Sequence, residues 1–252
     1  MSKYKATAVS YLNTKPLLYG LVTNPVLDLI ELQTDIPSVC ADKLINRAVD
    51  LALIPVAAIP SVPNAEIISD YCIGTKGTVK TVCIYSDRPI EEVEVLHLDY
   101  HSRTSVALTK ILLEEYWQVS PLLIDASPGY IDKIQGGTAG LVIGDRTIGL
   151  EEQFAYVYDL GEIWEKHTGM PFVFAAWVSN RQLDKSFIEQ FNAALAHGLD
   201  HINELMLILP SPAPGFDLKA YFTHYISYEL DRPKRKALDL FLTKLKANKP
   251  SK

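Results

Sequence analysis

The feature that most constrains this chain is the alternation of short β-branched runs with stretches of helical periodicity. Strands are predicted at residues 4–9, 26–32, 50–54, 66–69, 79–85, 93–98, 121–124, 140–143, 155–158 and 172–179. Between them, residues 38–49 and 104–116 repeat apolar side chains at helical spacing, and residues 187–209 form a longer amphipathic stretch. This alternation predicts an α/β protein with largely parallel sheets.

The alternation stops once, at Ser86-Asp87-Arg88-Pro89, and then begins again. Beyond residue 179 the pattern is wholly helical, with a loop at 211–215 and a terminal helix at 232–246. We therefore expect two lobes, one made of residues 1–85 together with 178–252, and the other made of residues 86–177 and inserted into the first. The strands at 79–85 and 172–179 would join the lobes as a hinge, with a ligand cleft between them.

Charge and hydropathy argue against two classes of partner. The 252 residues carry 24 Lys and Arg against 30 Asp and Glu, a net charge of −6. The chain therefore lacks the basic excess that displaces counterions from nucleic acid. Its most apolar segment, residues 49–60, contains Asp50 and Pro55 and is about half as long as a bilayer requires. We expect neither a nucleic acid nor a membrane as partner.

The N-terminus and the cysteines predict a cytoplasmic protein. Residues 1–9 include no apolar run followed by a small-residue cleavage site, which a secretory signal would need. Cys40, Cys72 and Cys83 form an odd number with no CxxC spacing, which is typical of buried thiols in a reducing compartment.

Two strand ends of the first lobe are candidate ligand sites, because ligands of open α/β sheets gather at the carboxyl ends of strands. The strand at 4–9 is followed by Ser10, Tyr11 and Asn13, and the amide of Asn13 can both donate to and accept from a substrate hydroxyl. The alternative role of this segment is a plain helix cap. After the strand at 50–54, Pro55 and Val56 begin a turn of small residues, which suits either close backbone approach to a ligand or tight packing.

A candidate anion site begins the helix that follows the strand at 93–98. Ser102, Arg103, Thr104 and Ser105 combine hydroxyls, a guanidinium and the free N–H groups of a helix start. The helix dipole and these donors both favour a carboxylate or phosphate. A solvated helix cap is the alternative.

Acidic and histidine side chains offer fewer candidates. Asp145 follows the strand at 140–143 and is either a general base or a loop-fixing group held by Arg146. His197 and His201 share a helical face, but a solvated face is the default for that spacing, and we expect no metal. The chain has no nucleophile elbow, phosphate loop or dinucleotide fingerprint, so we expect no cofactor.

Five segments in order along the chain resemble the chorismate dehydratases of the futalosine route to menaquinone. They are residues 9–17 (VSYLNTKPL), 50–56 (DLALIPV), 99–105 (DYHSRTS), 141–145 (LVIGD) and 164–173 (WEKHTGMPFV). The resemblance extends to about residue 180 and implies a cytoplasmic lyase with a two-lobed, periplasmic-binding-protein-like fold of type II. It also implies conversion of chorismate, a small-molecule substrate, to 3-[(1-carboxyvinyl)oxy]benzoate and water.

Strand-end position and resemblance together define the expected site. The substrate-binding candidates are Ser10, Tyr11, Pro55, Val56, Thr81, Ser102, Arg103, Thr104, Ser105, Gly144, Met170 and Phe172, and the catalytic candidates are Asn13 and Asp145. The proton acceptor is either the substrate's own enolpyruvyl carboxylate or Asp145. Two other functions stay open, a non-catalytic binding or sensing module for a small carboxylate and the related naphthoate-forming cyclase of the same pathway, and so does the oligomeric state.

Overall fold

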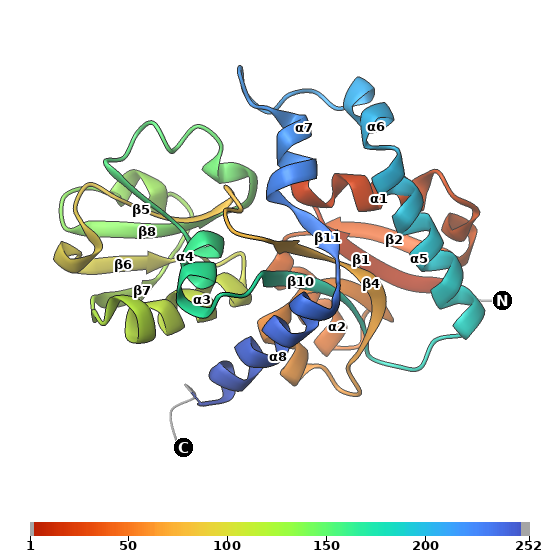
Figure 1. The fold of residues 1–252 in the computed structure, drawn as a ribbon. Coiled ribbons are helices and arrows are strands. Elements are labelled where there is room, and N and C mark those ends of the chain that lie inside the picture. The colour runs from red at the N-terminus through yellow and green to blue at the C-terminus, as the bar shows by residue number, and fades with distance from the viewer. Residues whose placement is uncertain (1–2, 248–252) are drawn as a thin grey trace.

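The protein has two β-sheets, each covered by helices (Figure 1). The structure is a computed structural model, and residues 3–247 of it are described. The first sheet has the strand order β11-β4-β10-β3-β1-β2 and the second has the order β7-β6-β8-β5-β9. The expected α/β class with two lobes is confirmed.

The first sheet is mixed, not largely parallel as predicted. β1 (Tyr4–Val9) pairs in parallel with both β2 (Ile30–Asp35) and β3 (Leu51–Pro55). On the other side of β3, the strand β10 (Phe172–Ser179) pairs antiparallel with both β3 and β4 (Glu66–Thr75). β11 (Ser227–Glu229) then pairs antiparallel with β4 at the edge of the sheet. Every residue of β3 and β10 is buried, since α1 (Lys15–Val22) and α5 (Lys185–Asp200) cover one face of the sheet while α2 (Pro37–Ile45) and α8 (Arg232–Ala247) cover the other (Figure 1).

The second sheet consists of five short strands. They are β5 (Val82–Ser86), β6 (Val95–Leu98), β7 (Leu122–Asp125), β8 (Thr138–Ile143) and β9 (Tyr156–Asp159). β6 is parallel to β7 and β8, whereas β5 is antiparallel to β8 and β9. Two helices, α3 (Arg103–Leu112) and α4 (Leu160–Thr168), belong to this lobe, and a π-helical turn at Leu113–Trp117 extends α3.

The chain passes between the sheets in two short segments, residues 76–81 and 169–171. These segments lie side by side, because Thr75 at the end of β4 pairs with Phe172 at the start of β10. β5 lies wholly in the second sheet and β10 wholly in the first. The boundaries expected after residues 85 and 177 therefore fall inside strands, and the hinge consists of the two crossing segments and not of the strands.

Local patterns explain the other differences from prediction. The strand expected at 26–32 begins only at Ile30, because Asn24 caps a 3₁₀ turn at Pro25–Leu29. The helix expected at 187–209 ends at Asp200, and α6 (Ile202–Ile208) follows it. The region expected to be wholly helical contains β11 as well as the short helix α7 (Leu218–Ala220).

Two glycines fix α1 against α5. A Cβ atom at Gly20 would lie 2.0 Å from the carbonyl oxygen of Ala194, and one at Gly198 would lie 2.0 Å from that of Pro16. Only glycine permits so close a backbone approach. This crossing sets the position of α1 and of the 3₁₀ turn before it, Leu12–Thr14. Across residues 3–247, none of the helices combines the length and apolar character needed to cross a bilayer.

Candidate active site between the lobes

A small cavity lies between the two sheets. Its polar lining comes from Tyr11, Asn13, Thr81, Ser102 and Ser105. The rest of its wall is formed by Val9, Pro37, Pro55, Ile73, Val79, Val82, Ile143, Gly144, Phe174 and Ala175. The structure thus brings together predicted residues from four strand ends and from the crossing segment, and it adds apolar residues that no sequence pattern had marked as site residues.

The N-terminus of α3 faces this cavity. Ser102 is its N-cap, and the Ser102 hydroxyl accepts the Ser105 N–H at 3.3 Å. Both serines are almost fully buried and both line the cavity. The N–H groups of the first helical turn have no partner within the helix, so they favour an anion at this position.

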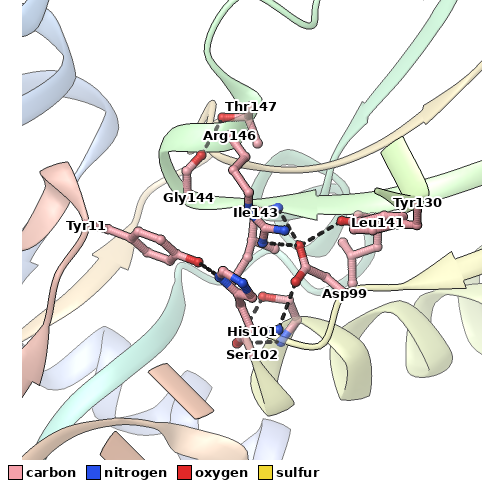
Figure 2. A network of polar contacts seen from close by, with 11 residues as sticks. Tyr11, Asp99, His101, Ser102, Tyr130, Leu141, Ile143, Gly144, Arg146 and Thr147 are labelled. Atoms are coloured by element: carbon pink, nitrogen blue, oxygen red, sulfur yellow. Dashed lines mark hydrogen bonds and ion pairs between the residues drawn. The ribbon is translucent and has the colours of Figure 1, made fainter. Parts of the chain in front are cut away.

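Tyr11 and His101 meet across the lobes (Figure 2). The Tyr11 hydroxyl is hydrogen-bonded to His101 Nδ1, and the tyrosine ring lies directly over Gly144. Burial, and then the positive charge of Arg146, lower the pKa of His101. Burial raises the pKa of Tyr11 well above its ordinary value. Near neutral pH this pair is therefore uncharged.

A buried carboxylate, Asp99, organises the polar groups beside this pair (Figure 2). Its Oδ2 accepts hydrogen bonds from Arg146 at 2.6 Å, from the Tyr130 hydroxyl at 2.9 Å and from the Ile143 N–H at 3.0 Å. Its Oδ1 accepts the His101 N–H at 2.8 Å. Sequence reasoning missed this network, although the position of Asp99 at a strand end was a usable signal.

Asn13 is held from the first lobe. Its carbonyl oxygen accepts a hydrogen bond from the Tyr228 hydroxyl at 2.8 Å, and its Oδ1 accepts one from the Thr14 hydroxyl at 3.2 Å. These two hydrogen bonds hold Asn13 in place at the wall of the cavity.

Asp145 lies beside the cavity, outside its lining. Its carboxylate accepts the Leu12 N–H at 2.9 and 3.1 Å and so links the lobes. Partial burial raises the pKa of Asp145, and the Leu12 hydrogen bond opposes that rise. Arg146 pairs with Asp99, so the expected fixing of Asp145 through Arg146 is wrong.

Arg103 also lies outside the cavity lining. Its guanidinium pairs with the Asp42 carboxylate of the first lobe at 2.5 Å, and both side chains are exposed. They line a wider, open groove of about 850 Å³ on the outer side of α3. The cavity wall at α3 therefore presents serines and backbone N–H groups, and the predicted guanidinium contact is absent from this arrangement.

Five further predicted residues do not line the cavity. Thr104 accepts the Ala57 N–H at 3.1 Å, next to the buried Val56, so these two residues contribute to the contact between lobes. Ser10 donates its N–H to Asp35 at 2.9 Å. Phe172 packs among Trp164, Phe174 and Phe241, and Met170 lines a separate surface groove. Phe174, two residues along β10 from Phe172, is the aromatic residue that lines the cavity.

The lobes are closed in this structure. The Ser38 N–H donates to the His101 carbonyl oxygen at 2.9 Å, in addition to the contacts of Leu12, Tyr11 and Ala57 across the lobes. The enclosed cavity has a volume of about 40 Å³, which admits a few water molecules and is far below the size of an ordinary ligand site. A substrate must therefore enter with the lobes apart.

In residues 3–247, no three His, Cys, Asp or Glu side chains gather in an arrangement that would hold a metal ion. The polar side chains that line the cavity carry hydroxyls and an amide, and backbone N–H groups at the start of α3 adjoin them. The imidazole of His101 and the carboxylate of Asp145 lie just outside the lining. This set can bind an oxyanion, orient a hydroxyl group and exclude water.

Comparison with known proteins agrees with the fold and points to a metabolic role. The sequence profile of a family described as menaquinone biosynthesis matches residues 4–247. A chorismate dehydratase from Thermus thermophilus is 27% identical over 207 residues, covering 69% of this chain and 71% of that protein. Among solved structures, a protein from Archaeoglobus fulgidus superposes with a TM-score of 0.75 at 14% identity over 97% of both chains.

Two further structures identify the fold type. A Candida albicans protein, described as having the generic periplasmic binding protein fold, matches with a TM-score of 0.62 at 12% identity, covering 100% of this chain and 92% of that one. The alkanesulfonate-binding protein SsuA from Xanthomonas axonopodis pv. citri matches with a TM-score of 0.61 at 13% identity, covering 97% and 93%. These likenesses confirm the periplasmic-binding-protein-like fold.

Proposed function

This chain belongs to the menaquinone-biosynthesis family, and on that premise we propose that it is a chorismate dehydratase. The observation that carries the proposal is the interlobe cavity, which is lined by Asn13 and by Ser102 and Ser105 at the N-terminus of α3. The family match over residues 4–247 supports it. The named dehydratase among its relatives supports the same reaction. The product would be 3-[(1-carboxyvinyl)oxy]benzoate, with release of one water.

The N-terminus of α3 is the proposed binding site for the ring carboxylate of chorismate. Ser102 and Ser105 supply hydroxyls there, and the first-turn N–H groups supply further donors. Removal of the ring C3 proton would spread negative charge through the C1–C2 double bond toward this carboxylate. Donors held at that position before the reaction would stabilise the charge as it develops.

The elimination breaks two bonds. The C3–H bond gives its electron pair to the ring, and the C4–O bond breaks to release the hydroxyl, which leaves as water when it takes up a proton. Aromatisation of the ring drives the step. Asn13, whose amide both donates and accepts, would orient the departing hydroxyl.

We propose the enolpyruvyl carboxylate of the substrate as the proton acceptor. Asp145, the protein-based alternative, lies outside the cavity lining and accepts the Leu12 N–H. The protein would then contribute position, electrostatic stabilisation and exclusion of water. No cofactor enters this scheme.

The remaining assignments follow from the proposed reaction. We place the protein in the cytoplasm, where chorismate would be its only required partner. Its three cysteines are free and buried, and burial raises the pKa of Cys40 to about 11 and that of Cys72 to about 12. Such inert thiols fit a reducing compartment.

Incubation of the purified protein with chorismate, followed by mass spectrometry, tests the proposal. The expected product is lighter than chorismate by the mass of one water. Chorismate binding without any mass change would contradict the dehydratase proposal and favour a binding or sensing module.

A further inference from the structure

A second chamber adjoins the cavity on the side of the crossing segment. It has a volume of about 210 Å³ and lies between the crossing segment, the Thr147–Glu151 turn and the Gly215–Tyr225 region. Thr81 lines both spaces, and its hydroxyl is hydrogen-bonded to the Tyr221 hydroxyl at 2.9 Å. This single pair of hydroxyls therefore stands between the inner cavity and the outer chamber.

The two spaces differ in charge. The residues that line the inner cavity include no Lys or Arg. The outer chamber is lined by one cation, Lys80, and by two acidic residues, Asp217 and Glu151. The Asp217 carboxylate caps α7 by accepting the Ala220 N–H at 2.9 Å, and Glu151 lies on an exposed turn.

Lys80 is held in a backbone conformation that non-glycine residues seldom adopt. Its φ is +71°, and the buried Asp159 carboxylate fixes it by accepting the N–H groups of Lys80 at 2.7 Å and of Val79 at 3.0 Å. The Lys80 ammonium lies 5.4 Å from the centre of the Tyr225 ring, at the chamber wall. Strained residues that the surroundings hold firmly in place are concentrated at functional sites.

Resting on the proposed function, we propose that the outer chamber is a second carboxylate subsite, in which Lys80 and the Thr81 hydroxyl bind the enolpyruvyl carboxylate of the substrate. Tyr221 would donate to the Thr81 oxygen, which leaves the Thr81 hydroxyl free to donate to the ligand. A dicarboxylate would then place one anion at the α3 N-terminus and the other beside Lys80. The carboxylate would lie at Thr81, where the two spaces meet, with one oxygen toward Lys80 and the other toward the C3 proton of the ring in the inner cavity.

Binding of two non-reacting probes by calorimetry tests this subsite. Benzoate carries only the ring carboxylate, whereas 3-(carboxymethoxy)benzoate carries both anions. Lys80→Met should weaken binding of the dicarboxylate by about 5- to 50-fold and change benzoate binding by less than about twofold. Lys80→Arg should restore most of the loss, and Glu151→Gln should tighten dicarboxylate binding.

Lys76→Met is the matched control. Lys76 lies in the same crossing segment, but its ammonium pairs with Asp231 at 3.3 Å and does not line the chamber. This variant should bind both probes like the wild type. Equal losses for both probes in Lys80→Met, or no loss for either, would overturn the subsite.

The outcomes separate the subsite from the dehydratase proposal. A wild-type protein that dehydrates chorismate, together with a Lys80→Met variant that binds the dicarboxylate normally, overturns the subsite alone. A wild-type protein with Lys80-dependent dicarboxylate binding but no product supports the subsite and overturns the reaction.

Discussion

The hydroxyl of Tyr11 in the first lobe is hydrogen-bonded to the imidazole of His101 in the second, and the Tyr11 ring lies against Gly144. The pair lies at the edge of the cavity, and neither residue can keep this contact when the lobes separate. It is therefore a marker of closure.

We expect acid to destabilise the folded protein through His101. Because burial lowers the pKa of His101 below its ordinary value of 6.5, the unfolded chain binds this proton more readily than the folded one. The contribution of neutral His101 to the free energy of unfolding is complete above pH 6.5 and is lost as the pH falls below that value. The free energy of unfolding should then change by at most about 1.4 kcal/mol per pH unit. Urea denaturation of the wild type and of His101→Gln between pH 5 and 8 measures how the free energy of unfolding of each protein depends on pH. The same pH dependence in both proteins would contradict a role for His101.

Gly144→Ala should impair closure. Gly144 has φ +66°, and a Cβ atom there would lie 2.5 Å from the Tyr11 ring, so the variant carries both backbone strain and a clash across the lobes. Gly149→Ala is the control, because Gly149 has φ +83° and nothing within 4 Å of its would-be Cβ. Both variants should lose about 1 kcal/mol of stability. In small-angle scattering with bound 3-(carboxymethoxy)benzoate, only Gly144→Ala should have a larger radius of gyration than the wild type. Equal radii of gyration for the two variants would contradict a clash between the added methyl group and Tyr11.

Asp145→Asn should reduce the single-turnover rate by less than about tenfold, well short of the roughly 10²–10⁴-fold loss that follows deletion of a general base. The amide oxygen of asparagine can still accept the Leu12 N–H. Asn13→Asp should be severe, because a new carboxylate repels a dianionic substrate and can no longer donate. A loss above about 10³-fold for Asp145→Asn, with affinity intact, would make Asp145 the base.

Arg103→Ala should change kcat/KM by less than about threefold. Arg103 pairs with Asp42 on the surface, and an exposed ion pair contributes about 0–1 kcal/mol. Asp42→Ala removes the other partner of the same ion pair, and its kcat/KM should equal that of Arg103→Ala. A tenfold or greater loss in Arg103→Ala alone would show that the guanidinium reaches the substrate.

Asp99→Ala should destabilise the protein by about 3–5 kcal/mol, because it leaves the charge of Arg146 and the Ile143 N–H without their buried partner. Asp87→Ala removes an exposed carboxylate that accepts one hydrogen bond, from the Gly136 N–H at 3.0 Å. Chemical denaturation should show only a small change in the free energy of unfolding for Asp87→Ala. Similar losses in both variants would argue against a special role for the Asp99 network.

The sequence predicted those features that depend on local periodicity. The strand at 172–179 matches β10 residue for residue, and the cap at Ser102 and the position of Asn13 follow from the rule that strand ends meet at one edge of a sheet. The direction of β10 could not be predicted, because an antiparallel addition to a buried sheet has the same apolar composition as a parallel one.

Side-chain pairing between distant parts of the chain was also outside the reach of sequence. Arg146 lies next to Asp145, but its partner is Asp99, which is 47 positions away. Arg103 opens the anion-binding helix, yet its long side chain extends outward to Asp42. Position in the chain favoured Asp145 as the partner of Arg146, and a helix start favoured a substrate carboxylate as the partner of Arg103. The direction of each side chain is set by tertiary packing instead.

The glycine crossing of α1 and α5 has a consequence for how such a chain can diverge. Gly20 and Gly198 do not line the cavity, but α1 begins directly after the turn that carries Asn13. A methyl group at either glycine would push α1 away from α5 and shift Asn13 relative to the α3 N-terminus. Selection for catalysis would therefore act on a contact between two helices outside the cavity, and neither glycine should tolerate a larger residue, alone or together with the other.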